Sequence, residues 1–334
     1  MTAYLARRFV GSVPVIVLIT LLVFCLLHAA PGDPAALLLP ESATEADIAA
    51  ARVRWGLDQP LYVQYGHFVL NTLQGDLGTS FRFSEPVRQL IAERFPATVE
   101  LTVLAMLIAL AIAVPLGTLA GARPNSWTDN AGTSLGLFGI SVPSFWSGIM
   151  LILAFAGILH VVPSAGRSTY GVAGPSITGL YLLDSLLTGN LAGVGDALAH
   201  LALPALALGA GLAGITMRIT RSSVLEASRE DFVVVARAKG LIRRTVLRRH
   251  VLRNALIPVV TIVGLEFGEI LANTVIVETV FAWPGMGSLL VTGVGSRDYP
   301  LVTGLVLLYA VIFVVINLAV DALYAAIDPR IRYA

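Results

Sequence analysis

Long apolar stretches alternate with more polar ones along the whole chain. Six of them are long enough for a helix that crosses the hydrocarbon core of a membrane, which needs about 20 mainly apolar residues. These runs cover residues 9–30, 98–121, 131–159, 201–219, 255–281 and 301–327. The pattern therefore predicts an all-α polytopic membrane protein, with six transmembrane helices in a single transmembrane domain that spans residues 1–334.

The first run raises the alternative of a cleaved signal peptide, because it follows Arg7 and Arg8 and ends near small residues. The apolar region of a signal peptide is usually about 7–15 residues long, which is shorter than this run. Its length favours an uncleaved span.

The distribution of arginine predicts the orientation, because loops on the cytoplasmic side carry an excess of Lys and Arg. If the N-terminus is cytoplasmic, six spans leave most basic residues inside, including the cluster from Arg218 to Arg253. Both termini are then cytoplasmic. The extracytoplasmic segments are 31–97, 160–200 and 282–300, and the large cytoplasmic loop is 220–254.

Composition agrees with a membrane protein. The 334 residues are 56% hydrophobic and only 13% charged, whereas soluble domains are about 25% charged. The net charge is +1 and the one basic cluster is flanked by spans, so we expect no nucleic-acid partner. Cys25 is the single cysteine, which excludes a disulfide within the chain.

Catalytic motifs are missing from the sequence. A phosphate-binding P-loop needs G-x-x-x-x-G-K-[ST], and the only lysine, Lys239, precedes Gly240 instead. The spans contain neither a Ser/His/Asp set nor HExxH, which argues against an intramembrane hydrolase. The glycines of GAGLAG (209–214) and GTSLG (132–136) lie in apolar runs, where small residues favour close helix packing. We expect no catalytic residue, cofactor site or metal ligand in this chain.

Three histidines lie near the predicted outer ends of spans: His28, His160 and His200. A nickel or haem site is one interpretation. An amphipathic ring at the membrane interface is the simpler one, because no metal-ligand spacing supports the first.

The loop 220–254 combines apolar and basic residues at helical spacing. Apolar positions are Val224, Phe232, Val233, Val235, Ala236 and Leu241, and charged ones are Arg229, Arg237, Arg244 and Arg248. Gly240 predicts a break between two short helices. A helix lying on acidic lipid is one interpretation, but the mixture of Asp231, Phe232 and arginines favours a docking surface for a cytoplasmic partner.

Residues 221–260, RSSVLEASREDFVVVARAKGLIRRTVLRRHVLRNALIPVV, closely resemble the cytoplasmic loop of the dipeptide/oligopeptide/nickel permeases of bacterial ABC importers. Other stretches resemble the same family in the same order: PGDP (31–34), YGHFVLNTLQGDLGTS (65–80), SVPSFWSGIMLIL (141–153), ETVFAWPGMG (278–287), RDYPLV (297–302) and DPRIR (328–332). The resemblance covers nearly the whole chain and is closest to the dipeptide-type first permease subunit.

This resemblance implies an ATP-driven importer in the bacterial cytoplasmic membrane that moves dipeptides or oligopeptides, or alternatively haem or a nickel chelate. It implies four kinds of partner: a second homologous permease subunit, two cytoplasmic ATPase subunits (or one fused), an extracytoplasmic substrate-binding protein and the lipid bilayer. ATP and Mg would be bound by the ATPases. A passive channel would not need a coupling loop.

The resemblance also implies a coupling helix that inserts into a groove on the ATPase. The residues that it assigns to this contact are Asp231, Phe232, Ala236, Arg237, Ala238, Lys239 and Gly240. The general importer loop begins with Glu-Ala-Ala, whereas this chain has Val-Val-Ala at 234–236, which matches the longer variant of this family.

Two glutamates and an asparagine lie near the middle of the fifth apolar run. Glu266, Glu269 and Asn273 are spaced i, i+3, i+7 and so share one helical face. A charged side chain in the centre of a span costs about 2.5–3.5 kcal/mol and generally faces a wet cavity, a partner or a counter-charge. We expect this face to line the translocation pathway. A structural ion pair with Arg218 is the alternative.

The outer segments 31–97 and 160–200 are longer than the joining of spans requires. We expect them to form the surface that receives the binding protein, and a rigid cap over the pathway is the alternative.

Overall fold

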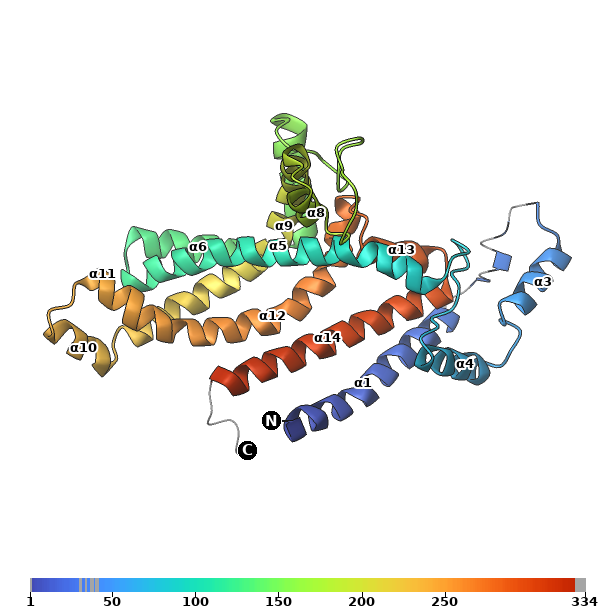
Figure 1. Ribbon diagram of the computed structural model, residues 1–334, viewed down its shortest axis with the longest axis horizontal. Coiled ribbons are helices and arrows are strands. Elements are labelled where there is room, and N and C mark those ends of the chain that lie inside the picture. Colours follow the sequence, from blue (N-terminus) through green and yellow to red (C-terminus); the bar gives the residue numbers. More distant parts are fainter. Residues whose placement is uncertain (1, 30–31, 34, 37–38, 40–41, 328–334) are drawn as a thin grey trace. The chain divides into compact units, whose positions relative to one another are not determined.

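The computed structural model describes residues 2–29, 32–33, 35–36, 39 and 42–327. Within this part of the chain the regular structure is helical, apart from an isolated bridge between Thr79 and Pro86 (Figure 1). The protein is therefore all-α, as predicted. The motif DPRIR and both prolines of PGDP lie outside the described residues.

Five helical segments of the described chain are long and apolar enough to cross a membrane. Four of them lie in α1 (Thr2–Ala29), α5 (Val87–Ala122), α9 (Leu191–Ala227) and α14 (Tyr299–Ile327). The other runs from Arg243 to Val280 and consists of α11 (Arg243–Thr245), η2 (Val246–Val251) and α12 (Leu252–Val280). A bent pair makes a sixth if it is counted as one span: α6 (Trp127–Ser141) and α7 (Ser144–Leu151), the latter continued by the π-helix η1 (Ile152–Ile158).

The bend between α6 and α7 is 105° and falls inside the run 131–159, for which the sequence predicts one span. Pro143 causes it. Proline offers no N–H to the preceding turn, and its ring forces the residue before it out of the helical region. Val142 accordingly has φ −96° and ψ 124°, an extended conformation.

Shorter helices occupy the predicted loops (Figure 1). The outer segments contain α3 (Glu45–Arg54), α4 (Leu61–Leu73), α8 (Tyr181–Leu187) and α13 (Met286–Gly295), and the cytoplasmic loop contains α10 (Asp231–Ala238), α11 (Arg243–Thr245) and the π-helix η2 (Val246–Val251). Helix α3 begins at a capping box, in which Thr44 and Asp47 each satisfy a backbone N–H of the other.

The chain divides into two compact units. The first consists of residues 1–96 and 284–318 and the second of residues 97–283 and 319–334. The core of the first unit contains Val87, Leu90, Ile91, Met286, Leu289, Leu301 and Leu305. Next to this core, buried Asp298 accepts hydrogen bonds from the Ser80 hydroxyl and from the Arg82 N–H at 3.1 Å.

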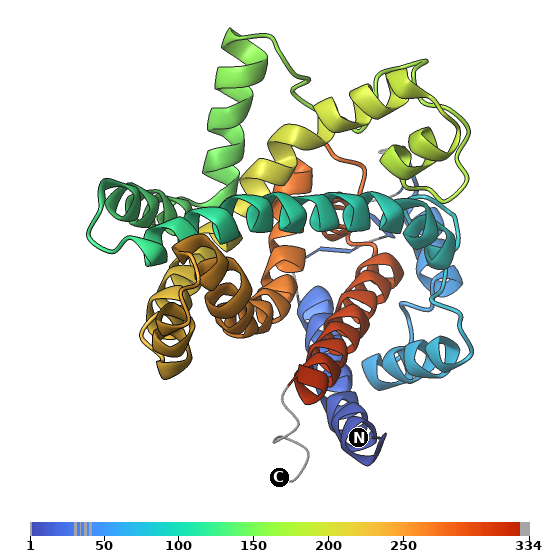
Figure 2. The same ribbon diagram turned by 60° about the vertical axis from the view of Figure 1, so that its left-hand side comes forward.

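The second unit is organised around α9, which packs against α6, α7, α8 and α12. Small residues let the teal α5 approach the yellow α9 closely (Figure 2). A Cβ at Gly117 would lie 2.6 Å from the Met217 carbonyl oxygen, and one at Gly209 would lie 2.7 Å from that of Ala105. The glycines of GAGLAG therefore serve helix packing, as the sequence indicates.

Candidate functional site

Helix α10 of the cytoplasmic loop has one inward face. Val233 and Ala236 are 1% and 5% exposed and pack in a cluster with Val224, Val246 and Val251. This cluster joins the end of α9 to η2 and fixes which way α10 turns. Ala236, which the resemblance assigns to the ATPase contact, is thus buried within the chain and supports α10 from behind.

The opposite face of α10 is open. Its exposed residues are Asp231, Val234, Val235, Arg237 and Ala238, and Phe232 is half-buried. Val234 and Val235 are 62% and 52% exposed although they are apolar. The resemblance does not point to these two valines. Their exposure follows from the burial of Val233 and Ala236, which turns the other side of the helix outward.

The turn after α10 has a conformation that favours glycine. Gly240 has φ +76°, and beyond its chain neighbours nothing in the described part of the chain lies within 4 Å of a Cβ added there. A side chain at this position would therefore meet backbone strain of roughly 1–2 kcal/mol and no clash. Lys239 and Ile242 on either side are exposed, Ile242 to 68%.

Two arginines connect the loop to α5 and α6. Arg221 forms an ion pair with buried Asp129 of α6, with 2.8 Å between Arg221 Nη2 and Asp129 Oδ2. Arg243 donates to the carbonyl oxygen of Ala122 at 2.7 Å, at the C-terminal end of α5. A cation is favourable there because the unpaired carbonyls carry partial negative charge.

A polar cavity of 230 Å³ lies in the second unit. It contains all three polar residues that the sequence places on one face of α12, namely Glu266, Glu269 and Asn273. The other walls are the α6–α7 bend at 142–144 and apolar residues of α9. Glu266 and Asn273 are half-buried and Glu269 is exposed.

Arg218, the candidate counter-charge, lines a different cavity. That space of 180 Å³ also contains Met217 and Arg221. Within the described part of the chain, no ion pair joins Arg218 to Glu266 or Glu269. The geometry thus favours a wet cavity over a structural ion pair.

Two family matches together cover most of the chain. Residues 113–333 match the family described as binding-protein-dependent transport system inner membrane component. Residues 1–102 match the N-terminal part of such a membrane component. The chain belongs to this family.

Several named permeases are similar to this chain over nearly the full length of both sequences. The chain is 40% identical over 333 residues to the dipeptide transport system permease protein DppB of Alkalihalophilus pseudofirmus, with 100% of both chains covered. It is 43% identical to the probable D,D-dipeptide transport system permease protein DdpB of Escherichia coli, covering 98% of this chain and 96% of the relative. It is 40% identical to the glutathione transport system permease protein GsiC of Salmonella typhimurium, again over 100% of both.

The chain is therefore a multi-pass permease of the inner membrane and a component of an ABC transporter. Permeases of this kind are not enzymes. This agrees with the missing P-loop and makes ATP hydrolysis the task of other subunits.

The outer segment 160–200 of this permease is held by buried charges. Arg167 pairs with Glu100 of α5 at 2.6 Å, and their side chains are 18% and 6% exposed. Glu100 also accepts the Leu182 N–H at 2.6 Å, and Arg167 lies 5.9 Å from the centre of the Trp283 ring. Arg167 is thus part of the internal support of this segment. Tyr170 of the same segment has a fully exposed side chain.

Asp184 supports the same segment from α8. It is 4% exposed and accepts hydrogen bonds from the backbone N–H groups of Ile177, Thr178 and Gly179 and from the Thr178 hydroxyl. Burial opposes its ionisation, but these hydrogen bonds outweigh burial and lower the pKa of Asp184 below its ordinary value. Burial, and then the hydrogen bond to Asp196, raises the pKa of Tyr181 to about 12.

Two of the three histidines near span ends, His28 and His200, have structural partners, whereas His160 is exposed. His28 contacts the Phe24 carbonyl oxygen at 2.8 Å and Gln64 at 3.1 Å, and His200 contacts the Gly166 carbonyl oxygen at 3.1 Å. Among the described residues, no group of three or more His, Cys, Asp or Glu could hold a metal ion.

Proposed function

We propose that this chain is the permease subunit of an ATP-driven importer of dipeptides and other short peptides, and that Glu266 and Glu269 receive the peptide's ammonium group. The observation that carries the proposal is the 230 Å³ cavity, in which both carboxylates and Asn273 meet among apolar helices. Charged residues within spans mark substrate or ion pathways unless they are paired. The printed names of the relatives, dipeptide and glutathione permeases, support the substrate class.

Energy reaches the permease through α10 in this proposal. Two cytoplasmic ATPase subunits, or one fused chain, bind ATP and Mg and contact the open face formed by Asp231, Val234, Val235 and Arg237. An exposed apolar patch rimmed by polar residues is typical of a protein–protein interaction site. Ala236 supports this face from within, and Gly240 allows the chain to turn away after it.

The complex also needs a second homologous permease and an extracytoplasmic binding protein. Segments 31–97 and 160–200 form the surface that receives the binding protein. The buried Arg167–Glu100 pair gives segment 160–200 a fixed shape, and fully exposed Tyr170 offers an aromatic contact on it. Aromatic residues are enriched at protein interfaces.

The test is transport by the complete complex, purified with its cognate subunits and reconstituted in vesicles. Glu266→Gln and Glu269→Gln together keep the shape of the cavity and remove its charge. We expect uptake of a labelled dipeptide to fall at least tenfold, since a charge-assisted hydrogen bond contributes about 1.5–3 kcal/mol. The control is Glu226→Gln, an exposed carboxylate on α9 outside the cavity.

Unchanged dipeptide uptake by the double variant would remove the glutamates from the pathway. Uptake of haem or a nickel chelate in place of dipeptides by the unmodified complex would overturn the peptide assignment and leave the importer architecture intact.

A further inference from the structure

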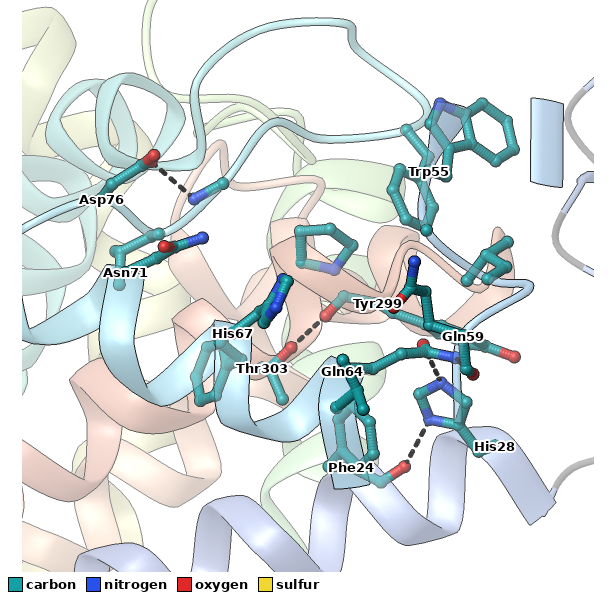
Figure 3. A pocket seen from close by; sticks show the side chains of 18 residues that line it. Phe24, His28, Trp55, Gln59, Gln64, His67, Asn71, Asp76, Tyr299 and Thr303 are labelled. Atoms are coloured by element: carbon teal, nitrogen blue, oxygen red, sulfur yellow. Dashed lines mark hydrogen bonds between the residues drawn. The ribbon is translucent and has the colours of Figure 1, made fainter. Parts of the chain in front are cut away.

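A second cavity lies in the first unit. Its volume is 290 Å³, and it is lined by the end of α1, by α4, by the two turns on either side of α4 and by the first turns of α14 (Figure 3). The predicted topology places it on the extracytoplasmic side, where imported solutes arrive. Nothing in the proposed transport path accounts for it.

One wall of this cavity is aromatic. The rings of Trp55 and Phe81 stack with centroids 4.5 Å apart and an angle of 13° between their planes. The Tyr299 ring lies 6.3 Å from Phe81 and 4.3 Å from His28. Such a wall favours a flat or bulky apolar group and, through its negative ring faces, a cation.

The opposite wall is polar and comes mainly from α4. Gln64, His67 and Asn71 share one face of the helix at spacing i, i+3, i+7 and point into the cavity (Figure 3). Gln64 is already bonded to His28 and to the Gln59 carbonyl oxygen at 2.8 Å. The side chains of His67 and Asn71 have no protein partner within the described chain and are available to a ligand.

The charge of the cavity selects the ligand. Among the described residues that line it, Asp76 is the only acidic one and none is Lys or Arg. One Asp76 oxygen accepts the Gly78 N–H at 2.8 Å, which leaves the other for a ligand. A carboxylate or phosphate would find no cation here, whereas an ammonium group would find a carboxylate, a carboxamide and aromatic faces.

We propose that this cavity binds the N-terminal residue of a short peptide before the peptide enters the membrane path. The ammonium group is held at Asp76 and Asn71, and a large first side chain packs against Trp55, Phe81 and Tyr299. The peptide's carboxylate faces outward to solvent. The inference rests on the proposed function only in taking peptides as the substrate, since the site and its charge are independent of the α12 cavity.

Trp55 allows a direct test on the full-length chain in nanodiscs made without ethanolamine lipid. The dipeptide Phe-Ala is titrated while tryptophan fluorescence is recorded, and Trp55→Phe removes the signal if it comes from this wall. We expect N-acetyl-Phe-Ala to bind at least tenfold more weakly than Phe-Ala, and Gly-Ala to bind more weakly too, because each lacks one of the two recognised groups.

Protein variants test the same site from the other side. Asp76→Asn should weaken Phe-Ala binding about tenfold and should abolish the difference between free and acetylated peptide. Asp58→Asn, an exposed carboxylate near the cavity that does not line it, should change neither. Asn71→Ala is the second variant, in case Asp76→Asn disturbs the turn at Gly78.

Several results would overturn the site: no binding of Phe-Ala, equal binding of the acetylated peptide, or a loss of binding on changing Glu266 and Glu269 in place of Asp76. Binding of an ethanolamine-headgroup lipid that excludes Phe-Ala would assign the cavity to lipid and would also overturn it. Failure of dipeptide transport in the reconstituted complex, with Phe-Ala still bound here, would refute the proposed function and leave this site standing.

Discussion

Two polar segments of the second unit, the cytoplasmic loop 220–254 and the outer segment 160–200, are both expected to contact partners but are held in opposite ways. Helix α10 of the loop is fixed by apolar packing of Val233 and Ala236. The outer segment is fixed by the carboxylates of Glu100 and Asp184. Both accept hydrogen bonds from backbone N–H groups, and Glu100 also pairs with Arg167.

The difference has consequences for what each surface can do. Apolar packing is non-directional, so it keeps α10 attached on one side while Val234 and Val235 stay exposed on the other. Hydrogen bonds to buried carboxylates are directional and costly to break. The outer segment therefore keeps one shape, as our proposal that it receives a binding protein requires.

The largest effect on stability is expected when a charge is placed behind α10. Val233→Asp buries an unpaired carboxylate at a position that is 1% exposed, and we expect a loss of several kcal/mol in the stability of the loop. The measurement is the rate of limited proteolysis in the loop, together with recovery of the ATPase in a pull-down.

Val234→Asp is the matched control, one residue along on the exposed face. It should leave proteolysis unchanged and weaken only ATPase recovery. Equal proteolysis of the two variants would mean that α10 has no inward face.

The next largest effect is expected in the outer segment. Arg167→Ala leaves Glu100 buried without its cation, and removal of one partner from a buried pair costs about 3–5 kcal/mol. Faster cleavage between residues 160 and 190 and a lower unfolding temperature in detergent would report it. Arg52→Ala is the control. It breaks the Arg52–Asp33 pair, whose side chains are 53% and 23% exposed, and should cost no more than about 1 kcal/mol.

The smallest effect is expected in the pH dependence of the stability of the outer segment. Because the pKa of folded Asp184 lies below its ordinary value, its stabilisation is complete above about pH 4 and is lost as pH falls through the folded pKa. Tyr181 adds an alkaline limit, since its stabilisation is lost as pH rises through about 12. Amide hydrogen exchange of residues 177–184 should therefore be constant near neutral pH, after correction for the intrinsic rate, and faster in acid.

Asp184→Asn should remove this acid dependence, and the apolar cluster behind α10 should show none in either protein. If amide hydrogen exchange became faster in acid to the same extent in both segments, the assignment of different forces to them would be contradicted.

Apolar runs of membrane length determined the helical class and the approximate positions of the spans, because backbone groups in a bilayer must be satisfied within helices. Helical periodicity likewise brought Glu266, Glu269 and Asn273 to one face of α12, and they line one cavity. Pro143 also indicates the bend between α6 and α7, but the apolar run 131–159 around it favours one continuous span.

Tertiary structure alone decided the rest. Periodicity cannot say which side of a short helix is covered, so the burial of Ala236 and the exposure of Val234 depended on contacts with η2 and α9. Arg167 and Glu100 are 67 positions apart and Phe24 and Tyr299 come from opposite ends of the chain. Such distant residues come together only when the chain folds. The local sequence pattern does not identify which distant residue will pair with a charge or line the same cavity.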